Sequence, residues 1–94
     1  MFLIVGLGNP GKFYKNNRHN IGFNIIDNIR DTYNFPDFSK KFKSEFCKSE
    51  LNKNILFLLK PTTFMNNSGI ALKEIKDFYN IDINNIYVIH DEID

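Results

Sequence analysis

The chain has 94 residues, enough for one small domain, and its hydrophobic content of 43% excludes an intrinsically disordered protein. The net charge of +1 gives no strong overall attraction to nucleic acid, and no apolar run approaches the roughly 20 residues that span a bilayer. The lone cysteine, Cys47, excludes an internal disulfide, and without a signal-peptide pattern we expect a soluble, cytoplasmic protein that makes no membrane contact.

The first element is a buried strand, predicted over Phe2–Gly6 by the apolar run Phe-Leu-Ile-Val. Three glycines and a proline fall within residues 6–11, and they predict a tight loop over Leu7–Arg18. Polar side chains follow just past the end of the strand, where open α/β sheets bind their ligands. These residues are Asn9, Tyr14, Arg18, His19 and Asn20.

The glycines in residues 6–11 also match the G-x-G-x-x-G turn of dinucleotide-binding domains. That turn needs a helix that begins at the glycines, so that the helix N-terminus meets the pyrophosphate. Here the apolar helical pattern begins only at Ile21, after the intervening residues Lys12–Arg18. A dinucleotide-binding α/β domain is therefore the less favoured alternative.

An amphipathic helix is predicted from about His19 to Asn34, because apolar residues recur every four positions. His19 lies at its N-terminus, where the positive end of the helix dipole disfavours a charged imidazole. A neutral imidazole can act as a general base, although for a histidine taken alone a capping or packing role is favoured. The expected buried stripe is Ile21, Ile25, Ile29 and Tyr33, flanked by Phe23 and Ile26.

The segment Ser39–Lys48 interleaves lysines with aromatic residues. Two interpretations stay open: contact with a phosphate backbone, or a solvated stretch that enters an edge strand, which lysines commonly protect. Glu45–Leu51 and Ile55–Lys60 then flank Asn52-Lys53-Asn54, a pattern typical of a β-hairpin. The run from Ile55 to Leu59 is apolar throughout, which predicts an interior strand.

A second amphipathic helix is predicted over about Ser68–Asn80, followed by a connector and a last strand, Ile86–Ile89. The order β-α-β-β-α-β predicts an α/β fold with a mixed, mostly parallel sheet flanked by helices. If the strands that begin at Phe2, Ile55 and Ile86 are parallel, the loops that leave their carboxyl ends share one edge. Four polar residues would then meet there: Asn9, His19, Asn66 and Asp91.

The C-terminal cluster His90-Asp91-Glu92-Ile93-Asp94 carries several carboxylates, which could suggest a metal site. Neighbouring strand residues point to opposite faces, so His90 and Asp91 should not share a site. No second histidine lies at a ligand-like spacing from either residue. We therefore expect no metal and no cofactor, and a structural role for His90.

Taken together, four segments resemble the bacterial-type peptidyl-tRNA hydrolases: LIVGLGNPG, FYKNNRHNIGF, KPTTFMNNSG and VIHDEID. They occur in the order and at about the spacing of that family, and they cover essentially the whole chain. The resemblance implies hydrolysis of the ester bond between peptide and tRNA in peptidyl-tRNA. It also implies a monomeric enzyme that needs no metal.

The resemblance carries functional residues over wherever the motifs match. His19 matches the histidine taken to be the catalytic base, and Asp91 matches an acid that would hold His19 in the productive tautomer. Asn9 and Asn66 match asparagines that hydrogen-bond the peptide backbone or the water, and Asn66 could also stabilise the developing oxyanion. The further substrate-binding residues are Tyr14, which can stack on the terminal nucleotide, and Phe64.

The family resemblance also implies a chain roughly twice this long, within the usual range of a domain. We therefore expect residues 1–94 to form a single α/β domain that is the N-terminal part of a longer hydrolase domain. A later asparagine, a helical lid and much of the basic tRNA surface have no counterpart here. The alternative to an ester hydrolase is a binding module that keeps the peptide-facing pocket and does no chemistry.

Overall fold

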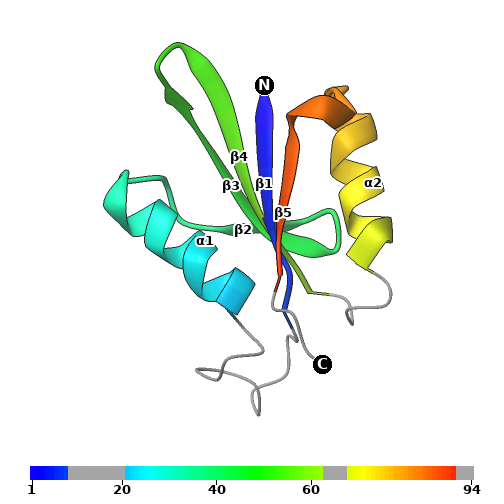
Figure 1. The fold of residues 1–94 in the computed structure, drawn as a ribbon, viewed down its shortest axis with the longest axis horizontal. Coiled ribbons are helices and arrows are strands. Elements are labelled where there is room, and N and C mark those ends of the chain that lie inside the picture. The colour runs from blue at the N-terminus through cyan, green and yellow to red at the C-terminus, as the bar shows by residue number, and fades with distance from the viewer. Residues whose placement is uncertain (9–20, 63–67, 91–94) are drawn as a thin grey trace.

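A computed structural model describes residues 1–8, 21–62 and 68–90. Within these residues the chain forms five strands, two α-helices and one 3₁₀ helix (Figure 1). The predicted first and last strands are confirmed at both of their ends. In chain order the elements are β1 (Phe2–Gly6), α1 (Ile21–Thr32), β2 (Ser39–Lys41), β3 (Ser44–Leu51), β4 (Asn54–Pro61), α2 (Ser68–Tyr79), η4 (Ile83–Asn85) and β5 (Ile86–Ile89).

One sheet holds the five strands in the order β2-β3-β4-β1-β5. β1 pairs in parallel with β4 on one side and with β5 on the other, whereas β3 pairs antiparallel with both β2 and β4. Within the described sheet only β3 therefore runs against the other strands. The predicted mixed, mostly parallel sheet is confirmed, and β2 is a strand that the sequence did not predict as a separate element.

The face of the sheet toward α2 carries the larger part of the core. Leu3 and Val5 of β1 and Phe57 and Leu59 of β4 pack there with Ile75 of α2. Figure 1 shows α1 and α2 on opposite sides of the sheet, so both faces of the central strands are covered. This double burial explains why β1 and β4 read as continuous apolar runs and not as alternating ones.

On the face of the sheet toward α1, the buried residues of the helix differ in part from the predicted stripe. Ile26 is fully buried against Leu58 of β4, whereas Ile21 and Tyr33 of the predicted stripe are 38% and 56% exposed. The residues that face the sheet are Gly22, Ile26 and Ile29, spaced as one side of a helix. The predicted stripe was chosen from bulky apolar side chains. The first residue of the observed face is instead a glycine, because the start of the helix packs against backbone atoms.

Two tight turns join the antiparallel strands. In the turn between β3 and β4, Asn52 and Lys53 have φ angles of 51° and 70°, as the predicted hairpin requires. In the turn between β2 and β3, Phe42 and Lys43 have φ angles of 57° and 50°. A left-handed turn made of phenylalanine and lysine carries no glycine or asparagine signal, which is why β2 was missed.

Candidate functional site

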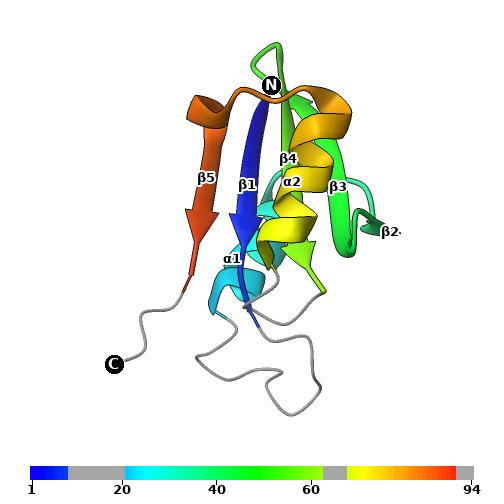
Figure 2. The ribbon, with the colours of Figure 1, turned by 90° about the vertical axis from the view of Figure 1, so that its right-hand side faces the viewer.

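Three parallel strands end side by side, at what we call the carboxyl edge of the sheet. β1 ends at Gly6, β4 at Pro61 and β5 at Ile89. β1 lies between the other two, and its register pairs Val5 with Leu59 and Gly6 with Ile89. Figure 2 shows the three arrowheads pointing the same way. The parallel arrangement from which a shared site was predicted is therefore confirmed.

The start of α1 packs directly against this edge. Leu7 N donates a hydrogen bond to Ile89 O at 2.9 Å, which joins the ends of β1 and β5. Gly22, in the first turn of α1, is buried against both of them. A methyl group at Gly22 would lie 2.6 Å from Leu7 N and 2.7 Å from Ile89 O, so only glycine fits. We call Leu7, Gly22 and Ile89 the edge junction.

The six predicted site residues all lie outside the described residues, and their roles stay predictions: Asn9, Tyr14, His19, Phe64, Asn66 and Asp91. The structure brings together described residues close to them in sequence. Asn9, His19 and Asp91 each lie two or three positions from a member of the edge junction. Phe64 and Asn66 come shortly after Thr62, the last described residue beyond β4.

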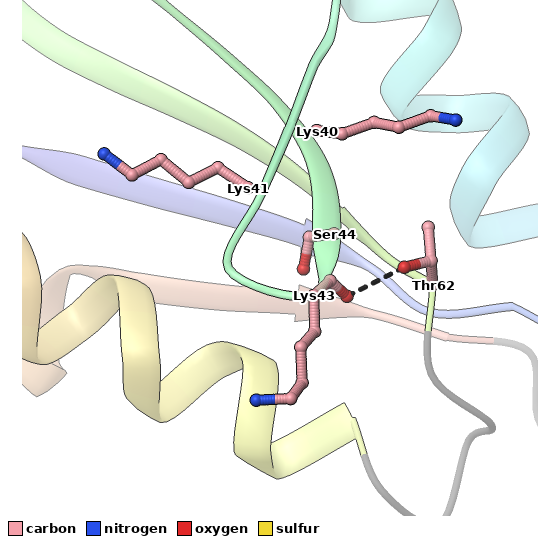
Figure 3. A pocket seen from close by; sticks show the side chains of 5 residues that line it. All are labelled: Lys40, Lys41, Lys43, Ser44 and Thr62. Atoms are coloured by element: carbon pink, nitrogen blue, oxygen red, sulfur yellow. Dashed lines mark hydrogen bonds between the residues drawn. The ribbon is translucent and has the colours of Figure 1, made fainter.

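A cavity of about 350 Å³ opens beside the carboxyl edge, between the β2–β3 turn and Thr62 (Figure 3). Its lining residues are Lys40, Lys41, Lys43, Ser44 and Thr62. In Figure 3 the three lysine side chains extend in different directions. Lys41 Nζ lies 4.2 Å from the centre of the Phe78 ring, and Lys43 Nζ lies 2.5 Å from Glu74 Oε1. The ammonium groups therefore do not converge on one anion.

These contacts bear on the two interpretations of the basic segment Ser39–Lys48. β2 is the outermost strand of the described sheet, so lysines do lie on an edge strand. The predicted solvated stretch is corrected, because Ser39–Lys41 is itself that edge strand and the next strand, β3, pairs on both sides. The ammonium groups of Lys41 and Lys48 also lie over aromatic rings, since Lys41 Nζ is 4.2 Å from the centre of the Phe78 ring and Lys48 Nζ is 5.5 Å from the centre of the Tyr79 ring. Contact with a phosphate backbone stays a prediction.

Cys47 does not have the properties of a nucleophile. Its side chain is buried on the α1 face of β3, beside Leu58 and Ile26. Burial raises the pKa of the thiol to about 11, although Arg30 and Lys60 act in the opposite direction. The thiolate is the reactive form, so Cys47 stays unreactive near neutral pH.

Among the described residues, no group of three or more histidine, cysteine, aspartate and glutamate side chains could hold a metal ion. No helix in the described part of the chain is long and apolar enough to cross a membrane. His90, which lies just beyond β5, is exposed.

Two features of the carboxyl edge were not predicted. Gly22 had a usable signal, since a glycine within an apolar helical pattern costs helix stability and so suggests a packing reason for its presence. The contact between Thr62 and Lys43 had none, because it uses the backbone carbonyl of Lys43, which donor atoms of Thr62 reach at 2.9 and 3.0 Å. Every residue has a backbone carbonyl, so the residue type at position 43 does not predict that its carbonyl accepts these bonds.

Comparison with known proteins identifies relatives over the whole chain. The family described as peptidyl-tRNA hydrolase matches residues 3–94. The peptidyl-tRNA hydrolase of Clostridium tetani is 51% identical over 94 residues, which are 100% of this chain and 50% of the relative. That of Bartonella henselae is 53% identical over 94 residues, again the whole chain and 49% of the relative.

Solved structures give the same result. A crystal structure of peptidyl-tRNA hydrolase from Acinetobacter baumannii is 37% identical to this chain with a TM-score of 0.91, and the match covers 100% of this chain and 48% of that one. The chain thus spans about half the length of the curated relatives that it matches. The described fold is that of the corresponding half of these proteins.

Proposed function

This chain belongs to the peptidyl-tRNA hydrolase family, and we propose that the carboxyl edge of its sheet carries the residues that hydrolyse the ester bond between peptide and tRNA. The observation that carries the proposal is the edge junction, where the start of α1 meets the ends of β1 and β5. The proposed base, His19, and its proposed partner, Asp91, lie on two of the chain segments that leave this point.

Covalent reach supports the pairing of these two residues. His19 precedes Gly22 by three residues, and Asp91 follows Ile89 by two. A residue spans at most about 3.6 Å, so the two segments reach no further than about 11 Å and 7 Å from the junction. Gly22 and Ile89 are themselves in backbone contact. The lengths of the two segments therefore allow a carboxylate oxygen of Asp91 to come within hydrogen-bond distance of the His19 ring.

In the proposed reaction His19 takes a proton from a water molecule as the water oxygen attacks the ester carbonyl carbon. Asp91 holds the imidazole in the tautomer that leaves one nitrogen free to accept that proton. Asn66 donates a hydrogen bond to the oxyanion that forms. The carbon–oxygen bond to the ribose then breaks, and the imidazolium returns its proton to the ribose oxygen. The products are a free peptide and a reusable tRNA.

The remaining proposed residues bind the substrate. Asn9 hydrogen-bonds the peptide backbone, Tyr14 stacks on the terminal nucleotide, and Phe64 contacts the substrate beside Asn66. The relatives are named peptidyl-tRNA hydrolases, which supports peptidyl-tRNA as the partner of this chain. We further propose that the full-length form of the protein acts as a monomer in the cytoplasm, without metal or cofactor.

The test is release of peptide from a peptidyl-tRNA with a labelled peptide, with a full-length relative as the positive control for the assay. His19→Ala should nearly abolish release, and Asp91→Asn should reduce it less, because the water can still be positioned. Asn66→Ala should lower kcat by about 10²–10³ if Asn66 stabilises the oxyanion. His90→Ala is the matched histidine control and should keep most of the activity. Full activity of His19→Ala would exclude the mechanism.

A second candidate is a module that binds peptidyl-tRNA without cleaving it. Binding of peptidyl-tRNA with no release of peptide, while the full-length relative cleaves the same substrate, would assign the chain to this alternative.

A further inference from the structure

We infer that the β2–β3 turn braces the carboxyl end of β4, and that Thr62 is a positioning residue for the proposed reaction. The inference rests on the proposed function, because the proposed residues Phe64 and Asn66 follow Thr62 in the sequence. By the brace we mean the hydrogen bonds between Thr62 and Lys43. They hold Thr62 in place, and the chain continues from Thr62 toward Phe64 and Asn66.

The brace consists of two hydrogen bonds to one acceptor. Thr62 N donates to Lys43 O at 2.9 Å. Thr62 Oγ1 donates to the same carbonyl at 3.0 Å, and this second bond is the dashed line in Figure 3. The ladder between β3 and β4 ends one step earlier, at the pair of Ser44 with Pro61. Thr62 thus extends the ladder by one residue. Its hydroxyl adds a bond that a β-strand does not otherwise supply.

The acceptor side of the brace is held in an unfavourable backbone conformation. Phe42 and Lys43 both have positive φ angles, at a cost of about 1–2 kcal/mol for each non-glycine residue. Such a conformation persists only where the surroundings over-determine it, and such sites often serve function. A turn that needed only to reverse the chain would place glycine or asparagine here.

Several contacts lock this turn against the rest of the molecule. The Phe42 ring is 8% exposed and lies edge-on to Phe46, Phe78 and Tyr79, with centroids 5.2 to 5.8 Å apart. Ser44 Oγ donates to Phe42 O at 2.8 Å. Lys43 Nζ pairs with Glu74 of α2. Contacts with both β3 and α2 therefore hold the Lys43 carbonyl in position.

Thr62→Val tests the brace, because valine keeps the branched shape and the backbone N–H but removes the hydroxyl donor. We expect kcat for peptide release to fall about threefold to tenfold, with a smaller change in KM, as one misplaced hydrogen bond predicts. Thr62→Ser restores the donor and should restore kcat. Thr32→Val makes the same change at the exposed end of α1 and should leave kcat unchanged.

A second measurement does not depend on catalysis. Nitrogen-15 relaxation of the Phe64 and Asn66 amides should report lower order in Thr62→Val than in wild type, Thr62→Ser or Thr32→Val. Unchanged relaxation at both amides would overturn the inference, as would a wild-type kcat in Thr62→Val. If the wild-type chain releases no peptide, the proposed function fails, and the relaxation result alone then decides for or against the brace.

Discussion

Gly22 is the residue on which the geometry of the edge junction depends most directly. Gly22→Ala would push a methyl group against the backbone of Leu7 and Ile89, which cannot move aside as a flexible side chain would. We expect the free energy of unfolding to fall by about 2–3 kcal/mol, measured by urea denaturation. The matched control is Gly69→Ala, because a Cβ there meets no atom within 4 Å.

In contrast to Gly22→Ala, Gly69→Ala should stabilise α2 by about 0.5–1 kcal/mol, since alanine is the better helix former. Equal destabilisation by both substitutions would show that the edge junction places no special demand on Gly22.

Cys47 makes the free energy of unfolding depend on pH in the alkaline range. Burial raises the pKa of its thiol from 9.0 to about 11, so folding favours the protonated form. This contribution to stability is fully present below pH 9 and is lost as the pH rises toward 11. We expect wild type to lose more stability than Cys47→Ala between these pH values. Parallel pH curves for the two proteins would contradict the assignment.

Lys60 ties the helix α1 to the sheet. Its side chain is only 12% exposed, and its ammonium group lies 2.6 Å from Asp27 of α1 and 4.0 Å from Glu45 of β3. Lys60→Met keeps the aliphatic packing but leaves both carboxylates without this partner. We expect a loss of about 1–2 kcal/mol in chemical denaturation, between the values for exposed and for buried pairs.

The exposed pair of Lys73 with Asp77 provides the control, since it joins two residues of the same helix at 2.6 Å. Lys73→Met should cost no more than about 0.5 kcal/mol. A similar loss in both variants would mean that Lys60 acts through general charge and not through the contact between α1 and the sheet.

At the level of elements, the apolar runs sufficed to predict β1, β4 and β5. For β1 and β4 the reason is that both faces of these central strands are covered, so few polar positions interrupt the run. The run of β5 is apolar although Tyr87 and Val88 are exposed. The predicted buried side of α1 was only partly correct, because Ile26 and Ile29 pack on the sheet whereas Ile21 and Tyr33 are exposed. The residue in closest contact with the sheet at the start of α1 is a glycine, which hydrophobic periodicity does not weigh. β2 was missed because packing of Phe42, and not turn chemistry, stabilises its turn. The shared edge followed from the parallel strands, whereas the Thr62 brace could not be predicted from side chains.

The whole molecule exposes apolar residues along β5, the outermost strand on the other side of the described sheet. Tyr87 and Val88 are 54% and 44% exposed, and the described residues supply no strand beyond them. Exposed apolar edges promote association, so we expect the 94-residue chain to self-associate as its concentration rises. Sedimentation velocity across a concentration series would measure this.

Val88→Lys should shift that equilibrium toward the monomer, because a charged edge residue disfavours strand pairing between molecules. Ile70→Lys is the control, since Ile70 is 51% exposed and belongs to α2 and not to β5. A strictly monomeric wild type, or equal effects of the two substitutions, would contradict an association through β5.

The central place of β1 has a consequence for the order in which the chain acquires structure during synthesis. Leu3 pairs with Phe57 and with Ile86, which leave the ribosome long after it, whereas the pairs of β2 with β3 and of β3 with β4 join near neighbours in sequence. We expect the β2–β3–β4 meander to form first, since local contacts close at lower entropic cost. In pulsed hydrogen exchange the Phe46 amide should then gain protection before the Ile4 amide. Until β4 emerges, the first residues of the nascent chain remain an apolar segment that chaperones can bind.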